Sequence, residues 1–457
     1  MAHAPKVLLI AEAANPEWVS VPLIGWSLAT ALRQVADVHI VTQIRNRDAF
    51  LRAGLVEGKD FTAIDSEKVA RPLFVLANIL RMGKGRGWTT TQLISSLGYG
   101  YFERLIWRKF GPDIRSGKFD LVHRITPVSP VVNSPMAPWC AAAGVPFLVG
   151  PINGGVPWPK EFGQVQSQER EWLSRIRKAY RLHPVRRRML QSACAILCGS
   201  SFALAEIPGK YANKLVYLPE NAVDPERFHH VAPQDGTLPL KACFVGRLVP
   251  LKGVDMALMA AADQIRAGKL TFDIVGDGPV MSDLQAIVES EAISHGVTFH
   301  GWKDHHDVQA IVARCNVLLF PSIREFGGGV VLEAMALGVP PIVVDYGGPA
   351  ELVDDATGWR LPLGDRARIT AHAKAVLDDL IRNPAVLAEK SAACRSRVKT
   401  DFTWSARAHQ IATVWTAVLE GTPSLPQPIS VPEAVASAWP GGFPVAEDKV
   451  PDGTIAA

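Results

Sequence analysis

Three consecutive glycines, Gly327 to Gly329, are the residues of this sequence best suited to bind an anion. They follow a short apolar run that ends at Phe320 and precede helix-forming residues, so we expect them to join a strand to a helix. Backbone N–H groups in such a run can approach an anion closely, and the helix start adds partial positive charge. The segment, with its neighbours Phe326 and Val330, is typical of a phosphate site. The alternative is a glycine turn without a ligand.

Two glutamates flank these glycines. Glu325 lies just before them, and Glu333 follows eight residues later, about one turn into the expected helix. Two carboxylates beside a phosphate would repel it, so we expect them to accept hydrogen bonds from neutral hydroxyl groups, such as those of a sugar and a ribose. Surface glutamates at the helix ends are the alternative.

Two cations accompany a second glycine turn. Arg247 follows the apolar run Ala242–Val245 and Gly246, and Lys252 lies five residues further on. The planar fork of an arginine and the point charge of a lysine together suit a diphosphate. Solvated loop cations are the alternative. A third glycine turn, which contains Gly278, follows the next apolar run.

The N-terminal half offers fewer such residues. His123 lies near the end of an apolar run, where it is either a functional residue or a hydrogen-bonded core histidine. Two further loops, one ending at Gly25 and one containing Asn153 and Gly154, also lie where strands are expected to end.

The elements that must position these residues alternate short apolar runs with longer segments of helical period. This alternation predicts an α/β protein with parallel sheets and crossover helices. In the first half, strands are expected at Lys6–Ala11, Val38–Thr42, Leu121–Arg124, Pro146–Val149, Ala195–Cys198 and Lys214–Leu218. In the second half they are expected at Ala242–Gly246, Phe272–Val275, Val297–His300, Val317–Phe320 and Pro341–Val344.

The chain divides into two α/β domains, 1–219 and 220–402, because the alternation pauses at a polar, proline-containing stretch after residue 218. We expect a helix at 403–420 to return to the N-terminal domain. The tail 421–457 is rich in Pro, Gly, Ala and Ser and is predicted to be disordered. The cleft between the two domains is the expected ligand site.

The composition excludes several classes of protein. With 48 Lys and Arg against 44 Asp and Glu in 457 residues, the net charge of +4 does not indicate a nucleic-acid partner. The six cysteines are scattered and no apolar run reaches the roughly 18 residues of a membrane span, so we expect a cytoplasmic protein. The basic segment 168–188 is either a solvated helix or a helix resting on an anionic membrane surface.

Motifs of other enzyme classes are missing from the sequence. It contains no Asp-x-Asp pair, so no site for a metal-bound diphosphate is predicted. Walker A, GxSxG and HExxH sequences are also absent, as is the GxGxxG of dinucleotide-binding enzymes.

The three glycine turns and the two glutamates, in their order and spacing from Ala242 to about Val353, resemble the family 4 glycosyltransferases. The resemblance implies the GT-B fold, in which two Rossmann-like domains face each other across a cleft, and sugar transfer from a nucleoside-diphosphate sugar with retention of configuration. This sequence departs from the usual family pattern at Phe326-Gly327, which is shifted by one position.

The resemblance also implies roles for the residues named above. Those expected to act in catalysis are Arg247, Lys252, Glu325 and His123. Those expected to bind the donor are Gly246, Gly278, His300, Gly301, Trp302, Phe326, Gly327, Gly328, Gly329, Val330 and Glu333. Those expected on the acceptor side are Gly25, Asn153 and Gly154.

The sequence therefore predicts a retaining, metal-independent hexosyltransferase that uses a UDP- or GDP-sugar and no cofactor. The acceptor is a glycan, a lipid-linked molecule or a small molecule, and polysaccharide or glycoconjugate synthesis is the expected setting. Peripheral association with the inner face of a membrane is a further hypothesis. Two alternatives are a nucleotide-sugar epimerase or hydrolase of the same fold, and a non-catalytic protein that binds sugar nucleotides.

Overall fold

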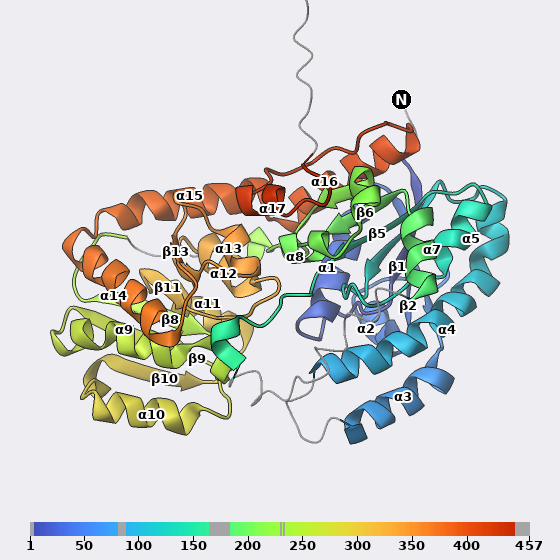
Figure 1. The fold of residues 1–457 in the computed structure, drawn as a ribbon. Coiled ribbons are helices and arrows are strands. Elements are labelled where there is room, and N and C mark those ends of the chain that lie inside the picture. Colours follow the sequence, from blue (N-terminus) through green and yellow to red (C-terminus); the bar gives the residue numbers. More distant parts are fainter. Residues whose placement is uncertain (1–3, 81–87, 164–182, 229–230, 232–233, 444–457) are drawn as a thin grey trace, which may run out of the picture.

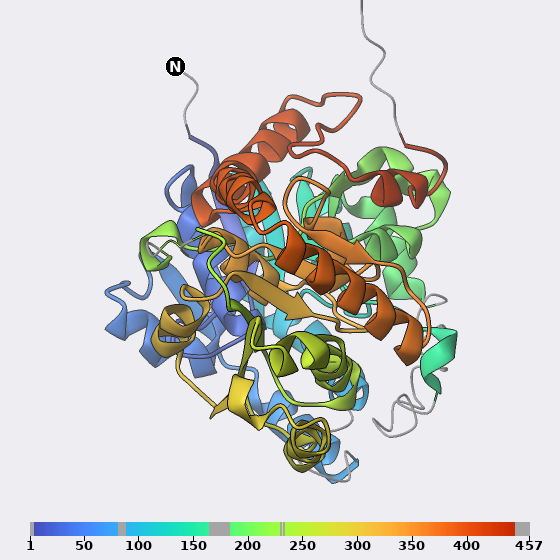
Figure 2. The same ribbon diagram turned by 90° about the vertical axis from the view of Figure 1, so that its left-hand side faces the viewer.

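The computed structural model describes residues 4–80, 88–163, 183–228, 231 and 234–443. Two parallel sheets form the centres of two domains that lie side by side (Figure 1). In Figure 2 the C-terminal domain lies in front of the N-terminal one. This arrangement confirms the predicted α/β fold of two Rossmann-like domains.

The N-terminal sheet has seven strands in the order β3-β2-β1-β4-β5-β6-β7, all paired in parallel. They are β1 (Lys6–Ala11), β2 (Asp37–Gln43), β3 (Phe61–Ile64), β4 (Leu121–Thr126), β5 (Phe147–Ile152), β6 (Ala195–Cys198) and β7 (Leu215–Tyr217). In β1, Leu8 and Ile10 join one apolar cluster while Val7 and Leu9 join another, because successive side chains point to opposite faces. Helices therefore cover both faces of this sheet.

The helices of the N-terminal domain differ widely in length. They are α1 (Val21–Leu32), α2 (Arg47–Arg52), α3 (Glu67–Leu80), α4 (Trp88–Arg115), α5 (Met136–Ala142), α7 (Pro184–Ser192) and α8 (Ser201–Ala205). Short 3-10 helices lie at Ile44–Asn46, Lys160–Phe162 and Gly209–Lys214. Residues 168–182 of the basic segment lie outside the described part of the chain, and its last residues begin α7.

The C-terminal sheet has six parallel strands in the order β10-β9-β8-β11-β12-β13. They are β8 (Leu240–Val245), β9 (Leu270–Val275), β10 (Val297–Gly301), β11 (Val317–Phe320), β12 (Pro341–Val344) and β13 (Trp359–Leu361). The helices are α9 (Val254–Arg266), α10 (Met281–Ser290), α11 (His305–Val312), α12 (Gly329–Ala336), α13 (Gly348–Leu352), α14 (Arg366–Arg382) and α15 (Val386–Asp401). Short 3-10 helices lie at Pro225–Arg227, Pro250–Lys252 and Ser294–Gly296.

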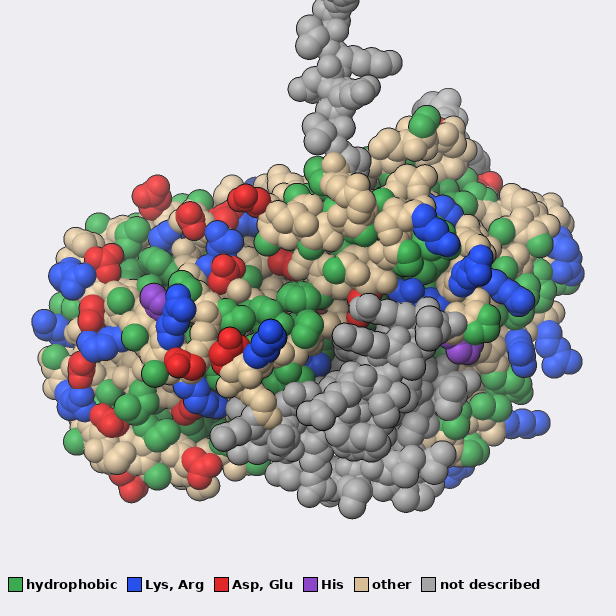
Figure 3. Space-filling model, in the orientation of Figure 1, with side chains coloured by type: hydrophobic (Ala, Val, Ile, Leu, Met, Phe, Trp, Pro, Cys, Tyr) green, Lys and Arg blue, Asp and Glu red, His purple; other side chains and the backbone are tan. Residues whose placement is uncertain are grey.

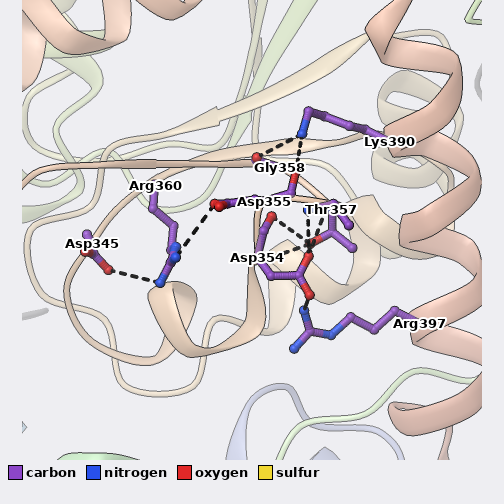
Figure 4. Close-up of polar contacts among 9 residues, drawn as sticks. Asp345, Asp354, Asp355, Thr357, Gly358, Arg360, Lys390 and Arg397 are labelled. Atoms are coloured by element: carbon purple, nitrogen blue, oxygen red, sulfur yellow. Dashed lines mark hydrogen bonds and ion pairs between the residues drawn. The ribbon is translucent and has the colours of Figure 1, made fainter. Parts of the chain in front are cut away.

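A polar cluster fastens α15 to the turn that precedes β13 (Figure 4). Arg397 of α15 forms an ion pair with Asp354, and Asp354 also accepts a 2.8 Å hydrogen bond from the Thr357 hydroxyl. Lys390, about two turns earlier on α15, donates to the carbonyl oxygens of Asp355 and Gly358. The turn before β13 is thus held in place by side chains of a single helix, α15.

The chain crosses between the domains twice, and the two crossings are hydrogen-bonded to each other. Val223 donates from its N–H to the Phe402 carbonyl at 2.8 Å, and its own carbonyl accepts from Trp404 at 3.2 Å. The second crossing leads into α16 (Trp404–Leu419), which packs on α1 of the N-terminal domain. Trp415 of α16 is fully buried in the same apolar cluster as Leu28 and Leu32 of α1.

The tail differs from its expected disorder over residues 421–443. Its helix α17 (Glu433–Ser437) lies near α8, and Ile429, Val435 and Trp439 are buried in the N-terminal core. Gln427 accepts from the Tyr217 N–H at 2.9 Å and donates to the Leu215 carbonyl at 3.0 Å. Since β7 is the outermost strand, this side chain satisfies backbone groups that would otherwise lack a ladder partner.

Candidate active site

A cleft of about 1320 Å³ lies between the two domains. Its C-terminal wall consists of His305, Arg324, Glu325, Phe326, Gly327, Gly328, Gly329 and Glu333. The linker contributes Glu220 to Phe228. The N-terminal wall comes from α1 and from the loops after β4 and β5, and it includes Val21, Leu23, Ile24, Trp26, Val128, Pro130, Val131, Asn153 and Gly154. Of the residues predicted from the sequence, the cleft brings together Glu325 to Gly329, Glu333, Asn153 and Gly154.

The glycine run forms the start of α12, as predicted. Gly328 precedes the helix in a left-handed conformation, with φ 63° and ψ 36°. Gly327 must be a glycine for a different reason. A Cβ atom there would lie 2.1 Å from Nδ2 of Asn221 and 2.2 Å from Oε1 of Glu220. The linker therefore passes directly over the run, and the backbone N–H groups at the start of α12 lie at the cleft.

Lys252 and Glu325 form an ion pair beside the run. The side chains are 13% and 21% exposed, and the Lys252 ammonium also lies 4.9 Å from the centre of the Phe320 ring. The carboxylate of Glu325 thus holds the ammonium at the carboxyl end of β11. Lys252 itself is not among the residues that line the cleft, whereas its partner Glu325 is.

Arg247 does not share this position. It is exposed, does not line the cleft, and its side chain has no hydrogen bond or ion pair within the described residues. The expected clamp of Arg247 and Lys252 is therefore not formed in this structure. Gly246 and Gly278 are also outside the lining. A Cβ atom at Gly278 would lie 2.2 Å from the Leu248 carbonyl, so this glycine allows two loops to pack closely.

Glu333 lies in α12 and lines the cleft. Burial raises the pKa of its carboxyl group, while the nearby charges of His305 and Arg227 lower it. A carboxyl group in these surroundings is suited to accept hydrogen bonds from hydroxyl groups.

The turn after β10 does not line the cleft. His300 is hydrogen-bonded to Asp273 at 2.6 Å, and the Trp302 side chain is 76% exposed. Gly301, the last residue of β10, and Val330 in α12 also lie outside the lining. The structure therefore does not place these four predicted donor-binding residues at the cleft.

His123 lies in the core of the N-terminal domain, not at the cleft. It is fully buried, and its Nε2 lies 2.8 Å from the Gly150 carbonyl. Its Nδ1 accepts a 3.1 Å hydrogen bond from the Trp415 indole. Burial lowers the pKa of this histidine to about 3, so the ring is neutral near pH 7. The structure favours the core histidine over the catalytic one.

Of the three residues predicted on the acceptor side, two line the cleft and one does not. Gly25 is buried in α1, where a Cβ atom would lie 2.1 Å from the Ala13 carbonyl, and it does not line the cleft. Asn153 and Gly154 do line it. Asn153 also donates to the Phe326 carbonyl at 3.1 Å, so it contacts the C-terminal wall directly.

Glu220 is a cleft residue that the sequence analysis missed. It is 5% exposed, and both of its carboxylate oxygens accept hydrogen bonds from Nδ2 of Asn153, at 2.9 and 2.8 Å. Burial raises the pKa of this carboxyl group. The signal that could have revealed it is an acidic residue next to an asparagine at the first position of the linker.

Further contacts join the domains around the cleft. Arg324 is 7% exposed and donates from Nε to the Val156 carbonyl at 3.0 Å. Glu351 of α13 accepts from the Ser201 N–H at 2.9 Å, from the Ser201 hydroxyl at 2.6 Å and from the Tyr217 hydroxyl at 3.1 Å. Burial raises the pKa of Glu351 to about 7 despite these three donors.

Within the described residues, no helix is long and apolar enough to cross a membrane. No group of three or more His, Cys, Asp or Glu side chains among them is arranged to hold a metal ion.

The fold is similar to that of several solved structures. About 90% of the chain superposes on the whole of the Anabaena protein Alr3699/HepE in complex with UDP, with a TM-score of 0.59 and 15% identity. A similar match, with a TM-score of 0.52, 15% identity and coverage of 89% and 99%, is found with WaaG, a glycosyltransferase involved in lipopolysaccharide biosynthesis. The architecture is the GT-B fold.

Sequence comparison matches part of the chain to a known family. Residues 228–396 match the family of glycosyl transferases group 1, and the chain carries a domain of that family there. It is 33% identical over 182 residues to 2-deoxystreptamine glucosyltransferase of Streptomyces kanamyceticus, covering 37% of this chain and 46% of that protein. It is 30% identical over 243 residues to glycogen synthase of Mycobacterium tuberculosis, covering 52% and 57%. The chain thus spans about half the length of these relatives.

Proposed function

We propose that this protein transfers a hexosyl group from a UDP- or GDP-sugar to a hydroxyl group of an acceptor. One observation carries the proposal. The Gly327–Gly329 start of α12 lines the interdomain cleft together with Glu325 and Glu333, and Glu325 holds the Lys252 ammonium directly behind this wall. Helix N–H groups and a lysine suit a diphosphate, and carboxylates suit the hydroxyl groups of sugar and ribose. The group 1 domain at residues 228–396 supports the same function.

The proposed reaction breaks the bond between C1 of the sugar and the phosphate oxygen. Negative charge then develops on the leaving diphosphate, and the N–H groups at the start of α12 and the Lys252 ammonium stabilise it. The acceptor oxygen forms the new bond to C1 on the same face. Its proton passes to an oxygen of the leaving phosphate, so configuration is retained without a protein nucleophile. Glu325 would hold the sugar and keep Lys252 in place.

The acceptor is proposed to be a glycan, a lipid-linked molecule or a small molecule of polysaccharide or glycoconjugate synthesis. Residues 1–219 contain 28 Lys and Arg but only 15 Asp and Glu, the reverse of the balance in the rest of the chain. Figure 3 shows basic side chains with few acidic neighbours on the N-terminal domain, whereas both signs mix over the C-terminal domain. This asymmetry favours an anionic acceptor or a peripheral site on an anionic membrane.

The test measures release of nucleoside diphosphate from a panel of UDP- and GDP-sugars, with and without candidate acceptors. We expect release that depends on an acceptor, persists in EDTA and is lost in Lys252→Ala. Equal release without an acceptor would indicate a hydrolase or an epimerase. Binding of the donor without any turnover would indicate a non-catalytic protein.

A further inference from the structure

We propose that Asn153 and Glu220 form a positioning pair that fixes the Gly327–Gly329 run against the N-terminal domain. The pair would set where the N–H groups at the start of α12 meet the donor diphosphate. The inference rests on the proposed function, and it adds two residues that act through the run and not by contact with the reacting atoms.

The hydrogen bonds of Asn153 fix its orientation. Its Oδ1 accepts from the Ser200 hydroxyl at 2.8 Å and from the Gly154 N–H at 2.6 Å. The opposite group, Nδ2, lies within 3.1 Å of both Glu220 oxygens and of the Phe326 carbonyl. A flipped amide would lose its bonds to the Gly154 N–H, to both Glu220 oxygens and to the Phe326 carbonyl, because none of these groups can reverse its role when Glu220 is ionised. Asn153 thus links the end of β5, the start of α8, the linker and the C-terminal wall.

The carboxylate of Glu220 lies between glycines of the two domains. A Cβ atom at Gly199 of the N-terminal domain would lie 2.5 Å from Oε2, and one at Gly327 of the C-terminal domain would lie 2.2 Å from Oε1. No other residue type fits at either place without displacing the carboxylate. Glu220 therefore sets the spacing between the N-terminal sheet and the glycine run, and it is a spacer as well as a hydrogen-bond acceptor.

Asn153 and Glu220 contact the chain where the glycine run begins, and this position is the reason for the positioning role proposed for them. The Phe326 carbonyl that Asn153 contacts immediately precedes the run, and Glu220 touches the first residue of the run. A displacement there moves the N–H groups relative to a bound diphosphate. A misplacement of about 1 Å in a catalytic site can cost about 10²-fold in rate.

The first variant exchanges one partner. Asn153→Asp places a carboxylate against the carboxylate of Glu220, at the distance now occupied by a hydrogen bond, and the repulsion should push the run away. We expect the affinity for UDP and GDP, measured by titration calorimetry, to fall at least about tenfold, with kcat falling further. Should Asn153→Asp fail to fold, Glu220→Ala removes both acceptors of Asn153 Nδ2 and the group that separates Gly199 from Gly327, and it carries the same test.

The second variant restores the pair. When Asn153→Asp is combined with Glu220→Gln, the carboxylate lies at position 153 and can still accept from Ser200 and Gly154, while the amide introduced at position 220 donates to it. We expect nucleotide affinity to recover by at least half of the lost factor. Glu289→Gln, a substitution of an exposed residue of α10, serves as the matched control and should keep wild-type affinity and turnover.

The outcomes separate this inference from the proposed function. Lowered melting temperature with unchanged nucleotide affinity in Asn153→Asp, or a double variant no better than the single one, would overturn the positioning role while leaving the enzyme assignment intact. A wild-type protein that binds neither UDP nor GDP would instead overturn the proposed function and the inference built on it.

Discussion

The two walls of the cleft are made in different ways. The C-terminal wall consists mainly of one continuous loop and helix, Arg324 to Glu333, whose backbone N–H groups and carboxylates are chemically specific. The N-terminal wall comes from separate segments and mixes apolar side chains, such as Leu23 and Val131, with polar and basic ones, such as Asn133 and Arg104. The first wall offers one compact set of groups for charge and hydroxyl recognition, whereas the second offers scattered groups of several kinds.

This difference suggests a division of labour. A donor diphosphate needs the same few groups whatever sugar it carries, so one short motif can supply them. An acceptor site built from residues of several segments can change without disturbing that motif. If this division holds, substitutions in the C-terminal wall should affect donor binding and turnover, and those in the N-terminal wall should affect only the acceptor.

The largest expected effect concerns the two cations. Lys252→Ala should lower kcat by about 10²–10³-fold, because it removes a charge that stabilises the leaving diphosphate. Arg247→Ala should lower it far less, because Arg247 is exposed, whereas Lys252 is held by an ion pair with Glu325, which lines the cleft. Steady-state kinetics with saturating donor provides the measurement. An equal loss in both variants would show that Arg247 moves into the cleft during the reaction.

A second prediction tests the contact of Glu351 with Ser201 and Tyr217, which joins the two domains. The folded-state pKa of Glu351 is about 7 and its ordinary value is 4.5. The neutral form favours the folded state, so this stabilisation is complete below about pH 4.5 and is lost as the pH rises through 7. Wild-type protein should therefore lose about 3 kcal/mol relative to Glu351→Gln over this window. Chemical denaturation at each pH measures the difference, and parallel curves for the two proteins would refute it.

The third prediction tests the close contact over the glycine run. Gly327→Ala should lower kcat/KM for the donor by about 10²-fold, because its Cβ atom would displace Glu220 and Asn221 and shift the run. Gly163→Ala is the matched control, since a Cβ atom there meets nothing within 4 Å. Wild-type kinetics in Gly327→Ala would mean that the linker is free to move away.

A smaller effect is expected in the middle of α12. Glu333→Ala should raise the donor KM by about fivefold and leave kcat nearly unchanged, since the loss of one hydrogen bond to a hydroxyl group is worth about 1 kcal/mol. A matching series with the 2′-deoxy and 3′-deoxy nucleotides would show whether the hydroxyl is that of the ribose. An unchanged KM would remove the carboxyl group from the donor site.

The smallest effect belongs to the N-terminal wall. Leu23→Ala should leave the affinity for nucleoside diphosphate unchanged and raise the acceptor KM a few-fold, because it removes apolar contact area only. Calorimetry with UDP and GDP and kinetics with varied acceptor separate the two. A loss of nucleotide affinity would contradict the division between the walls.

The fold was largely predictable, and the strands that were missed share one property. β3 and β13 are edge strands of four and three residues, and β13 contains Trp359 and Arg360, so neither gives the apolar run of a buried strand. The ordered part of the tail was missed because its contacts depend on a few apolar side chains, Ile429, Val435 and Trp439, among proline- and glycine-rich neighbours.

The site was predictable where one segment supplies both the spacing and the direction of its side chains. Glu325 to Gly329 and Glu333 are of this kind. Sequence position alone could place His123 near a strand end but could not show that its ring points to Trp415, 292 residues away in the chain. Glu220 was missed because its partner, Asn153, lies 67 residues away in a different segment.

The hydrogen-bonded double crossing at Val223 and Phe402 has a consequence for dissecting the protein. The N-terminal domain is completed by residues from the far end of the chain, since Trp415 and Trp439 fill its core. A truncated polypeptide that stops at residue 219 would expose the two apolar surfaces that Trp415 and Trp439 cover, and it would aggregate. Two polypeptides separated within the linker, in contrast, should reassemble when expressed together, because the second one carries the missing pieces of the first.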